Sequence, residues 1–219
     1  MGLDPAYVRS VNVGVLAPNP AKGGATGFAK WPVSGPVAVS APGAPKGASG
    51  LAGDAIGDGK NHGGDDQAVY AFAREDLDRW EDELGRALPD GSFGENLTTW
   101  GVDPNAALIG EQWRVGDDLV LQVSGPRLPC KTFAARMGVR AWAGRFSADG
   151  RPGAYLRVVR PGRVRAGDPI VVSHRPDHDV SVSLALFAFT SRPGLLAGLL
   201  AAGDDLSAEM RGYIHSKLK

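Results

Sequence analysis

The fold class of this chain is decided by the stretch Trp113-Arg114-Val115-Gly116-Asp117-Asp118-Leu119-Val120-Leu121-Gln122-Val123. Two runs rich in apolar and β-branched residues flank three residues that suit a tight turn, so the stretch predicts a β-hairpin. Working outward, further short strands bounded by Gly and Pro are predicted at residues 11–15, 37–39, 154–159 and 170–173. We therefore expect a mainly β region over residues 8–173.

One amphipathic helix is predicted within this β region. Its apolar stripe recurs at a spacing of three to four residues and consists of Val69, Phe72, Ala73, Leu77, Trp80 and Leu84. Asp65 or Asp66 can cap its start, and Gly85 suits its C-terminal end. We expect its aromatic side chains to belong to the core rather than to a cofactor site.

After Pro176 the sequence pattern changes from short strands to short helices. Residues 180–189, 193–202 and 207–218 are each typical of a short helix, with Pro193 and Ser207 at suitable starting positions. Helices of about ten residues are marginally stable alone. We therefore expect a small three-helix domain over residues 179–219, which packs either on the β region or across a homodimer.

Composition bounds the class of protein. The chain has 219 residues, of which 43% are hydrophobic and 22% charged, which is ordinary for a globular protein. A formal net charge of zero argues against a general nucleic-acid binder. The sequence shows no export signal, and no apolar run approaches the ~18 residues of a membrane span. With a single cysteine, these features predict a cytoplasmic protein without nucleic-acid or membrane partners.

The single cysteine lies in the run Ser124-Gly125-Pro126-Arg127-Leu128-Pro129-Cys130-Lys131. Two prolines stiffen the backbone before the sulfur, and Arg127 and Lys131 place positive charge beside it. Residues 132–137 are typical of a short helix, and a cysteine at a helix start between cations favours the thiolate. Two interpretations remain open. Cys130 is either a working sulfur that attacks electrophiles or binds a soft metal, or a small apolar residue that fills a gap.

Charge is distributed unevenly along the chain. Acidic residues dominate positions 65–83, whereas basic residues dominate positions 127–165, which include Cys130. The basic stretch predicts a positive field that attracts an anionic cofactor or substrate. The alternative is a solvated basic face without a ligand.

Two polar motifs lie upstream of the cysteine. The first, Lys60-Asn61-His62-Gly63-Gly64-Asp65-Asp66-Gln67-Ala68, suits an anion-binding turn in which Lys60 and His62 supply charge or a proton. The second, Gly94-Glu95-Asn96, is typical of a strand start with inward polar groups that read a heterocycle edge. The alternatives are a glycine-rich turn with an exposed histidine, and an ordinary strand entry.

The order of these motifs closely resembles the MOSC domain, and its YiiM-like branch most of all. The resemblance covers roughly residues 8–173, and the segment from residue 179 is similar to the three-helix domain that follows in that branch. Its motifs are, in order, Gly50-Leu51-Ala52-Gly53-Asp54, then His62-Gly63-Gly64, then Phe93-Gly94-Glu95-Asn96-Leu97, then Ile109-Gly110-Glu111, then Gly116-Asp117, then Pro126-Arg127-Leu128-Pro129-Cys130.

The resemblance implies an α+β fold built on a MOSC-type β-barrel, with a packed helix, that holds the molybdenum cofactor (molybdopterin), a phosphorylated pterin with a dithiolene. Cys130 is the implied molybdenum ligand, which suits the preference of soft metals for thiolate. Lys30, in Phe28-Ala29-Lys30-Trp31-Pro32-Val33, matches a basic position of the family. The expected cofactor-binding residues are Lys30, Lys60, His62, Glu95, Asn96 and Arg127. Pyridoxal phosphate binding is associated with the family as a whole.

The function implied is detoxification by a reductase of N-hydroxylated compounds such as hydroxylamino-purines, with Cys130 and His62 as catalytic residues. Because the sequence has no iron–sulfur cysteine cluster and no dinucleotide fingerprint, an electron-donor protein is expected as a partner. Four alternatives stay open: a persulfide carrier, a non-catalytic cofactor-binding protein, a cysteine hydrolase using Cys130 with His62, and a zinc site formed by Cys130, His62, His174 and His178.

Overall fold

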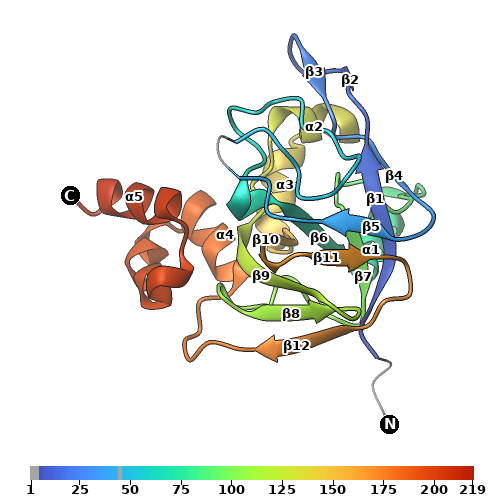
Figure 1. The fold of residues 1–219 in the computed structure, drawn as a ribbon. Coiled ribbons are helices and arrows are strands. Elements are labelled where there is room, and N and C mark those ends of the chain that lie inside the picture. The colour runs from blue at the N-terminus through green and yellow to red at the C-terminus, as the bar shows by residue number, and fades with distance from the viewer. Residues whose placement is uncertain (1–4, 44–45) are drawn as a thin grey trace.

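The computed structural model describes residues 5–43 and 46–219 and contains a mixed α+β fold (Figure 1). Its main element is an eight-stranded sheet with the strand order β12-β8-β9-β10-β6-β7-β1-β4. In that order the strands are Ile170–His174, Gln112–Val115, Leu119–Pro126, Ala154–Arg160, Val69–Ala73, Leu97–Trp100, Tyr7–Gly14 and Lys30–Pro32. β6 and β7 run parallel, and the other neighbours run antiparallel.

Smaller elements complete the fold. β5 (Val37–Val39) pairs with β11 (Gly162–Val164), and β2 (Ala17–Pro18) pairs with β3 (Ala25–Thr26) to form a hairpin. The helices are η1 (Asp65–Gln67), α1 (Arg74–Leu84), α2 (Lys131–Met137), α3 (Trp142–Asp149), α4 (Val182–Thr190), η2 (Pro193–Asp205) and α5 (Ala208–Lys217). Along the part of the chain that the structure describes, no helix is both long enough and apolar enough to cross a bilayer.

The sheet curls but does not close into the β-barrel that we expected. Its two ends approach each other, because Val8 N–H donates to Asp168 O at 2.9 Å and Ile170 N–H donates to Ala6 O at 2.8 Å. These bonds surround a single bridge between Tyr7 and Pro169 rather than a ladder. Proline has no N–H to donate, and the outer edge of β1 beyond this point pairs with β4 instead. The result is an open, strongly curved sheet.

The predicted hairpin is confirmed as β8 and β9, which pair from Gln112↔Gln122 to Val115↔Leu119. The strands expected at residues 37–39, 154–159 and 170–173 are present as β5, β10 and β12, and residues 11–14 belong to β1. The short helix after the cysteine is present as α2. The three C-terminal helical segments are also present, although the middle one, η2, is a kinked 3₁₀ segment.

The helix predicted from residue 69 begins five residues later. Residues 69–73 form β6, whose side chains are all buried, and α1 begins at Arg74. A strand buried on both faces is a continuous apolar run, and such a run also satisfies a helical stripe. Asp65 and Asp66 therefore do not cap α1 but belong to η1. The predicted end is confirmed, because Gly85 adopts the left-handed conformation with φ of 63°.

Two apolar clusters hold the fold together. One is aromatic and joins β6 to α1, α2 and α3 through Phe72, Trp80, Phe93, Phe133 and Trp142. The other lies inside the curved sheet and continues into α4, η2 and α5, where its buried members include Val182, Leu199, Leu206 and Ile214. Figure 1 shows these C-terminal helices grouped beside β9 and β10. The division into domains 8–173 and 179–219 remains a prediction.

Candidate functional site

A cavity of about 80 Å³ collects most of the residues that the sequence singled out. Its walls come from the start of β4, from β6 and β10, from the residues just after β9, and from loop residues between 49 and 67. The predicted site residues that line it are Lys30, His62, Asn96, Arg127 and Cys130. Segments far apart in the sequence therefore meet around one sulfur.

Cys130 precedes the first residue of α2 and has an extended backbone with φ of −117° and ψ of 169°. Burial raises the pKa of this thiol, but a hydrogen bond with His62, the charge of Arg127 and the backbone N–H of Phe133 outweigh burial. The net effect lowers the pKa of Cys130 to about 6. This lowered pKa favours the thiolate, as the interpretation of a working sulfur requires.

Arg127 is a buried cation whose charge acts on the Cys130 thiol. Its guanidinium lies 5.1, 5.0 and 4.9 Å from the ring centres of Phe28, Tyr70 and Phe133. Its Nε is buried without an acceptor, and within residues 5–43 and 46–219 no carboxylate forms an ion pair with it. Buried polar groups are nearly always hydrogen-bonded. The arrangement therefore leaves capacity for a bound anion.

Lys30 has a partner that the sequence reasoning did not identify. Its ammonium forms an ion pair with Asp54, and the two side chains are 6% and 0% exposed. Asp54 also accepts hydrogen bonds from Asn96 Nδ2 at 2.9 Å and from Gly14 N–H at 2.8 Å. Burial lowers the pKa of Lys30, and the neighbouring Asp54 opposes that shift. Lys30 is thus largely neutralised, so Arg127 contributes most of the free positive charge at this cavity.

Glu95 does not line the cavity. Its carboxylate accepts hydrogen bonds from Gly91 N–H at 2.5 Å, Phe93 N–H at 2.9 Å and the Thr98 hydroxyl at 2.9 Å. Burial raises the pKa of Glu95 to about 7, against the effect of these bonds. These contacts stabilise the 91–95 turn, and the contact of Glu95 with a cofactor ring remains a prediction from the sequence.

Lys60 and His62 are two positions apart in the sequence, but only His62 lies at the cavity that contains Cys130. Lys60 is exposed and does not line the cavity that contains Cys130, so the structure does not bring it to the site. His62 lines the small cavity. Gly63 has φ of 80°, and a Cβ at this position would lie 2.6 Å from the Ala48 carbonyl oxygen. The His-Gly-Gly motif thus provides a turn that only glycine can make and that places His62 at the thiol.

A larger cavity of about 510 Å³ lies next to the first one. The two share four lining residues, which are His62, Gly63, Gln67 and Tyr155. Gln67 and Tyr155 were not singled out from the sequence. Neither residue has a distinctive sequence signal, because both reach the cavities only when β10 packs against η1.

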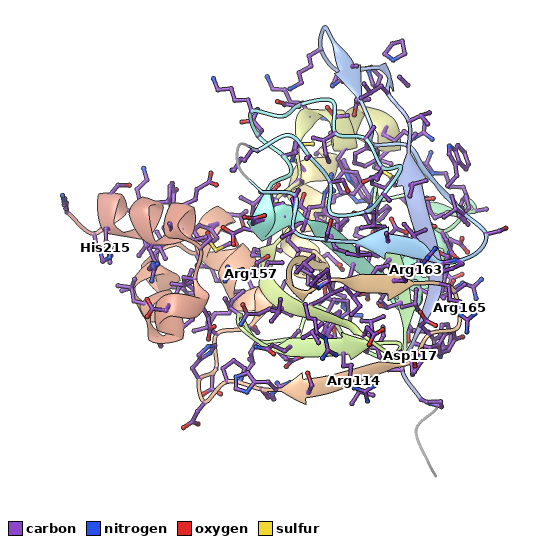
Figure 2. All side chains as sticks on the ribbon, viewed as in Figure 1. Arg114, Asp117, Arg157, Arg163, Arg165 and His215 are labelled. Atoms are coloured by element: carbon purple, nitrogen blue, oxygen red, sulfur yellow. The ribbon has the colours of Figure 1, made fainter. Side chains whose placement is uncertain are left out.

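The basic stretch at residues 127–165 does not converge on Cys130. Figure 2 shows Arg157 between the sheet and the C-terminal helices, whereas Arg163 and Arg165 lie on the other side of the molecule. Arg157 pairs with Asp66 at 2.8 Å, and Arg165 pairs with Asp168 at 3.4 Å. Within this basic stretch, Arg127 is the cation that lines the cavity with Cys130.

The described residues give no structural support for the zinc site that the sequence left open. Within the part of the chain that is described, no three His, Cys, Asp or Glu side chains gather in a geometry that could hold a metal ion. His174 is exposed at the end of β12 and does not line either cavity.

Comparison with known proteins places these features in a family context. The MOSC domain model matches residues 58–171. YflK of Bacillus subtilis, an uncharacterized protein, is 38% identical over 61% of this chain, and YiiM of Escherichia coli is 33% identical over 62%. A protein named "Reductase" from Gibberella moniliformis is 34% identical over 52%. The matched regions span 60%, 61% and 21% of those three proteins, respectively.

The similarity extends to solved structures. The crystal structure of YiiM from Geobacillus stearothermophilus has a TM-score of 0.78 and 26% sequence identity, and the match covers 98% of this chain and all of that one. The mixed sheet and the C-terminal helices are therefore features that this chain shares with a solved relative.

Proposed function

Because this chain belongs to the MOSC domain family and matches YiiM in both sequence and structure, we propose that it is a molybdenum cofactor-dependent reductase of N-hydroxylated compounds. The relative named "Reductase" supports the reaction type. The proposed role is detoxification of compounds such as hydroxylamino-purines.

One observation carries the proposal. Cys130, whose pKa is lowered to about 6, lies at the wall of the same cavity as the buried Arg127, which forms no ion pair with a carboxylate among the described residues. A thiolate is a suitable ligand for molybdenum, and a guanidinium suits the phosphate of the cofactor. Both chemical demands of a phosphorylated, sulfur-rich metal cofactor are therefore met by residues only three positions apart in the sequence.

The donor set fits the cofactor chemically, and Cys130 and Arg127 are the residues that would hold it. When bound, the cofactor would supply the two-electron chemistry of the reduction. The cavity of about 80 Å³ is smaller than the roughly 300 Å³ at which ligand sites usually begin. The β2–β3 hairpin covers it through a hydrogen bond from Asn19 to Thr132 at 3.0 Å and an ion pair between Lys22 and Asp58. We expect this hairpin to open when the cofactor binds.

The overall reaction converts an N–OH group, two electrons and two protons into an N–H group and one water molecule. His62 lines both cavities, and in this proposal it passes a proton towards the substrate nitrogen or the leaving oxygen. The electrons come from a donor protein, or in the assay from a reduced viologen dye. Asn96 and Asp54 hold Lys30 in place rather than taking part in proton transfer.

The proposal is tested by purifying the protein from a host that makes the molybdenum cofactor and measuring bound molybdenum and pterin. We expect both to be present, and we expect reduction of 6-hydroxylaminopurine with reduced viologen. Cys130→Ser should abolish that activity and leave the circular dichroism spectrum unchanged. A wild-type protein that carries neither molybdenum nor pterin would overturn the proposal.

The other outcomes identify the alternative functions. Cofactor bound without turnover would point to storage or delivery of the cofactor. A persulfide on Cys130, detected by intact-protein mass, together with the absence of reductase activity would indicate a sulfur carrier, which a nucleophilic thiolate also suits. His174→Ala is the matched control, because this histidine is exposed and lines neither cavity.

A further inference from the structure

A surface cleft of about 220 Å³ lies beside β4, where the ends of α1 and α2 meet. Its lining includes Trp31 from β4, Arg86 from just after α1, and Arg136 from the last turn of α2. Lys30 lines this cleft and also lines the cavity that contains Cys130. A single residue of β4 therefore lies between the cleft and the proposed cofactor site.

The strand β4 reaches both sites because its side chains alternate. Successive residues of a strand point to opposite faces. The Lys30 side chain is 6% exposed, whereas the next residue, Trp31, is 56% exposed. Gly91 packs against the same strand, since a Cβ at this position would lie 2.5 Å from the Lys30 carbonyl oxygen. The loop that follows α1 is thereby held against β4, beside the exposed indole.

Two arginines give this cleft its positive charge. Arg86 donates a hydrogen bond to the Met137 carbonyl oxygen at 2.6 Å, which joins the end of α1 to the end of α2. Along residues 5–43 and 46–219, neither Arg86 nor Arg136 forms an ion pair with a carboxylate. Asp90, which also lines the cleft, already forms ion pairs with two other arginines. The positive charge is therefore available to an acidic partner.

The segment around α2 adds charge of the same sign. No acidic residue occurs at positions 127–148, and Lys131 and Arg140 are exposed before and after Arg136. An α-helix rises about 1.5 Å per residue, so Arg136 lies about 9 Å along α2 from Cys130. The basic face and the sulfur are thus at opposite ends of one short helix.

These features suit brief contact with another redox protein. Tryptophan and arginine are the residues that most often carry the binding free energy of protein interfaces. Electron-transfer partners bury small interfaces, below about 1,200 Å² in total, and opposite charges speed their encounter. With a single cysteine, this chain cannot hold an iron–sulfur cluster of its own. The proposed reduction therefore needs electrons from a separate donor that comes close to Cys130.

We propose that the cleft around Trp31, Arg86 and Arg136 is the docking site of a small acidic electron-carrier protein. This inference rests on the proposed reductase function and assigns the surface through which its electrons enter. The carrier loses two electrons in total, and the N–OH group takes up these electrons with two protons to give N–H and water. Carboxylates of the carrier face the two guanidinium groups, and the indole contacts the less polar surface around its redox centre.

The first test compares electron sources for the holoenzyme. Reduced flavodoxin and reduced plant-type ferredoxin are the acidic protein donors, and reduced viologen is the small-molecule donor. In Arg86→Glu and in Arg136→Glu, we expect reduction of 6-hydroxylaminopurine by the protein donors to slow about tenfold at low salt, because an attraction becomes a repulsion. The rate with viologen should not fall. Equal rates with a protein donor in wild type and both variants, or an equal loss with viologen, would overturn the inference.

Arg160→Glu is the matched control for Arg86→Glu. Arg160 is also exposed and donates to a backbone carbonyl oxygen, that of Asp118, at 2.6 Å, but it does not line the cleft. We expect this variant to keep the wild-type rate with every donor. A loss as large as that in Arg86→Glu would show that net charge, rather than this cleft, governs the encounter, and would refute the docking site.

The second test measures binding without turnover. The purified protein is titrated with oxidised flavodoxin and oxidised ferredoxin in a calorimeter at low and at high salt. We expect at least one carrier to bind, more weakly at high salt and more weakly to Trp31→Ala. Failure of both carriers to bind, or binding that neither salt nor Trp31→Ala weakens, would contradict the inference. Binding of a single-stranded oligodeoxythymidine in place of either carrier would assign the face to nucleic acid instead.

The outcomes separate this inference from the function on which it rests. If the wild-type holoenzyme reduces no hydroxylaminopurine even with viologen, the proposed function fails. The calorimetric titrations then still decide whether an acidic carrier docks at Trp31 and the two arginines. If viologen supports turnover but neither protein donor does, the reductase function stands and the docking site is refuted.

Discussion

At the scale of single residues, Cys130 owes its character to neighbours that outweigh burial. A buried thiol ordinarily stays protonated, yet three donors or charges from different segments converge on this sulfur. The sequence placed Arg127 beside Cys130. The contact with His62, which is 68 positions away along the chain, arises only because the His-Gly-Gly turn folds against the start of α2.

His62→Ala is expected to raise the pKa of Cys130 by about one to two pH units, since a charge-assisted hydrogen bond is worth roughly 1.5–3 kcal/mol. In cofactor-free wild-type protein, the rate of iodoacetamide alkylation should rise through a midpoint near pH 6 and then level off. In the variant the midpoint should move upwards. An unchanged midpoint would show that Arg127 and the Phe133 N–H alone hold the thiolate.

The raised pKa of Glu95 predicts how the stability of the protein depends on pH. Its folded-state pKa of about 7 exceeds its ordinary value of 4.5, so the folded state binds this proton more tightly than the unfolded state. The contribution to stability is therefore complete below pH 4.5 and is lost as pH rises towards 7. Its size is on the order of 3 kcal/mol. Urea midpoints at pH 5 and pH 7.5 should differ less in Glu95→Gln than in wild type, and an identical pH dependence would contradict this account.

At the scale of secondary-structure elements, the hairpin β8–β9, α2 and the C-terminal helices could be predicted because their local signals are unambiguous. Turn residues between two apolar, β-branched runs predict the hairpin, and the residues after Cys130 have the pattern of a short helix. The strand at residues 69–73 could not be recognised in this way, because a strand buried on both faces shows no alternation of apolar and polar residues. α3 (Trp142–Asp149) was missed, since its boundary depends on packing of Trp142 and Phe146 against α1 and α2.

The site was predictable to the extent that its motifs need particular residue types. Lys30, His62, Asn96, Arg127 and Cys130 do meet at one cavity. Glu95 and Lys60 fell within the right motifs but point elsewhere, because sequence position does not determine the side-chain direction in a loop. Asp54, the partner of Lys30, and Gln67 required the fold to bring them to the site.

The turn that carries His62 gives a prediction at this scale. Gly63→Ala should destabilise the protein by more than the roughly 1–2 kcal/mol of a left-handed alanine, because the new Cβ meets the Ala48 carbonyl. Gly24→Ala is the matched control, since Gly24 has φ of 91° and a Cβ there meets no atom within 4 Å. Chemical denaturation of both variants measures the difference, and equal losses would show that the contact with Ala48 is irrelevant.

At the scale of the whole molecule, one apolar cluster joins the sheet to the C-terminal helices. Val182, Ala185, Leu199 and Ile214 are all fully buried within it. Removal of residues 179–219 would expose the sheet side of this cluster, where Ile109 and Val123 lie. The helical segment therefore contributes to folding of the sheet as well as covering one side of it.

Calorimetry should accordingly give one cooperative unfolding transition for the full chain, in which the two predicted domains melt together. The fragment ending at residue 178 should unfold at a lower temperature or aggregate, because several fully buried apolar side chains lose their partners. Two separate transitions, or a fragment as stable as the full chain, would instead support two independently folding domains.

Arg127 links the function of the protein to its lifetime. A buried guanidinium that lacks a carboxylate partner within the described residues makes the empty protein less stable than its core alone would allow. A ligand that neutralises this charge at a hundredfold excess over its Kd would stabilise the folded state by about 2.7 kcal/mol. Empty molecules would then unfold more often and be degraded first by cellular proteases. The abundance of this protein would thereby follow the supply of its anionic ligand without a dedicated regulator.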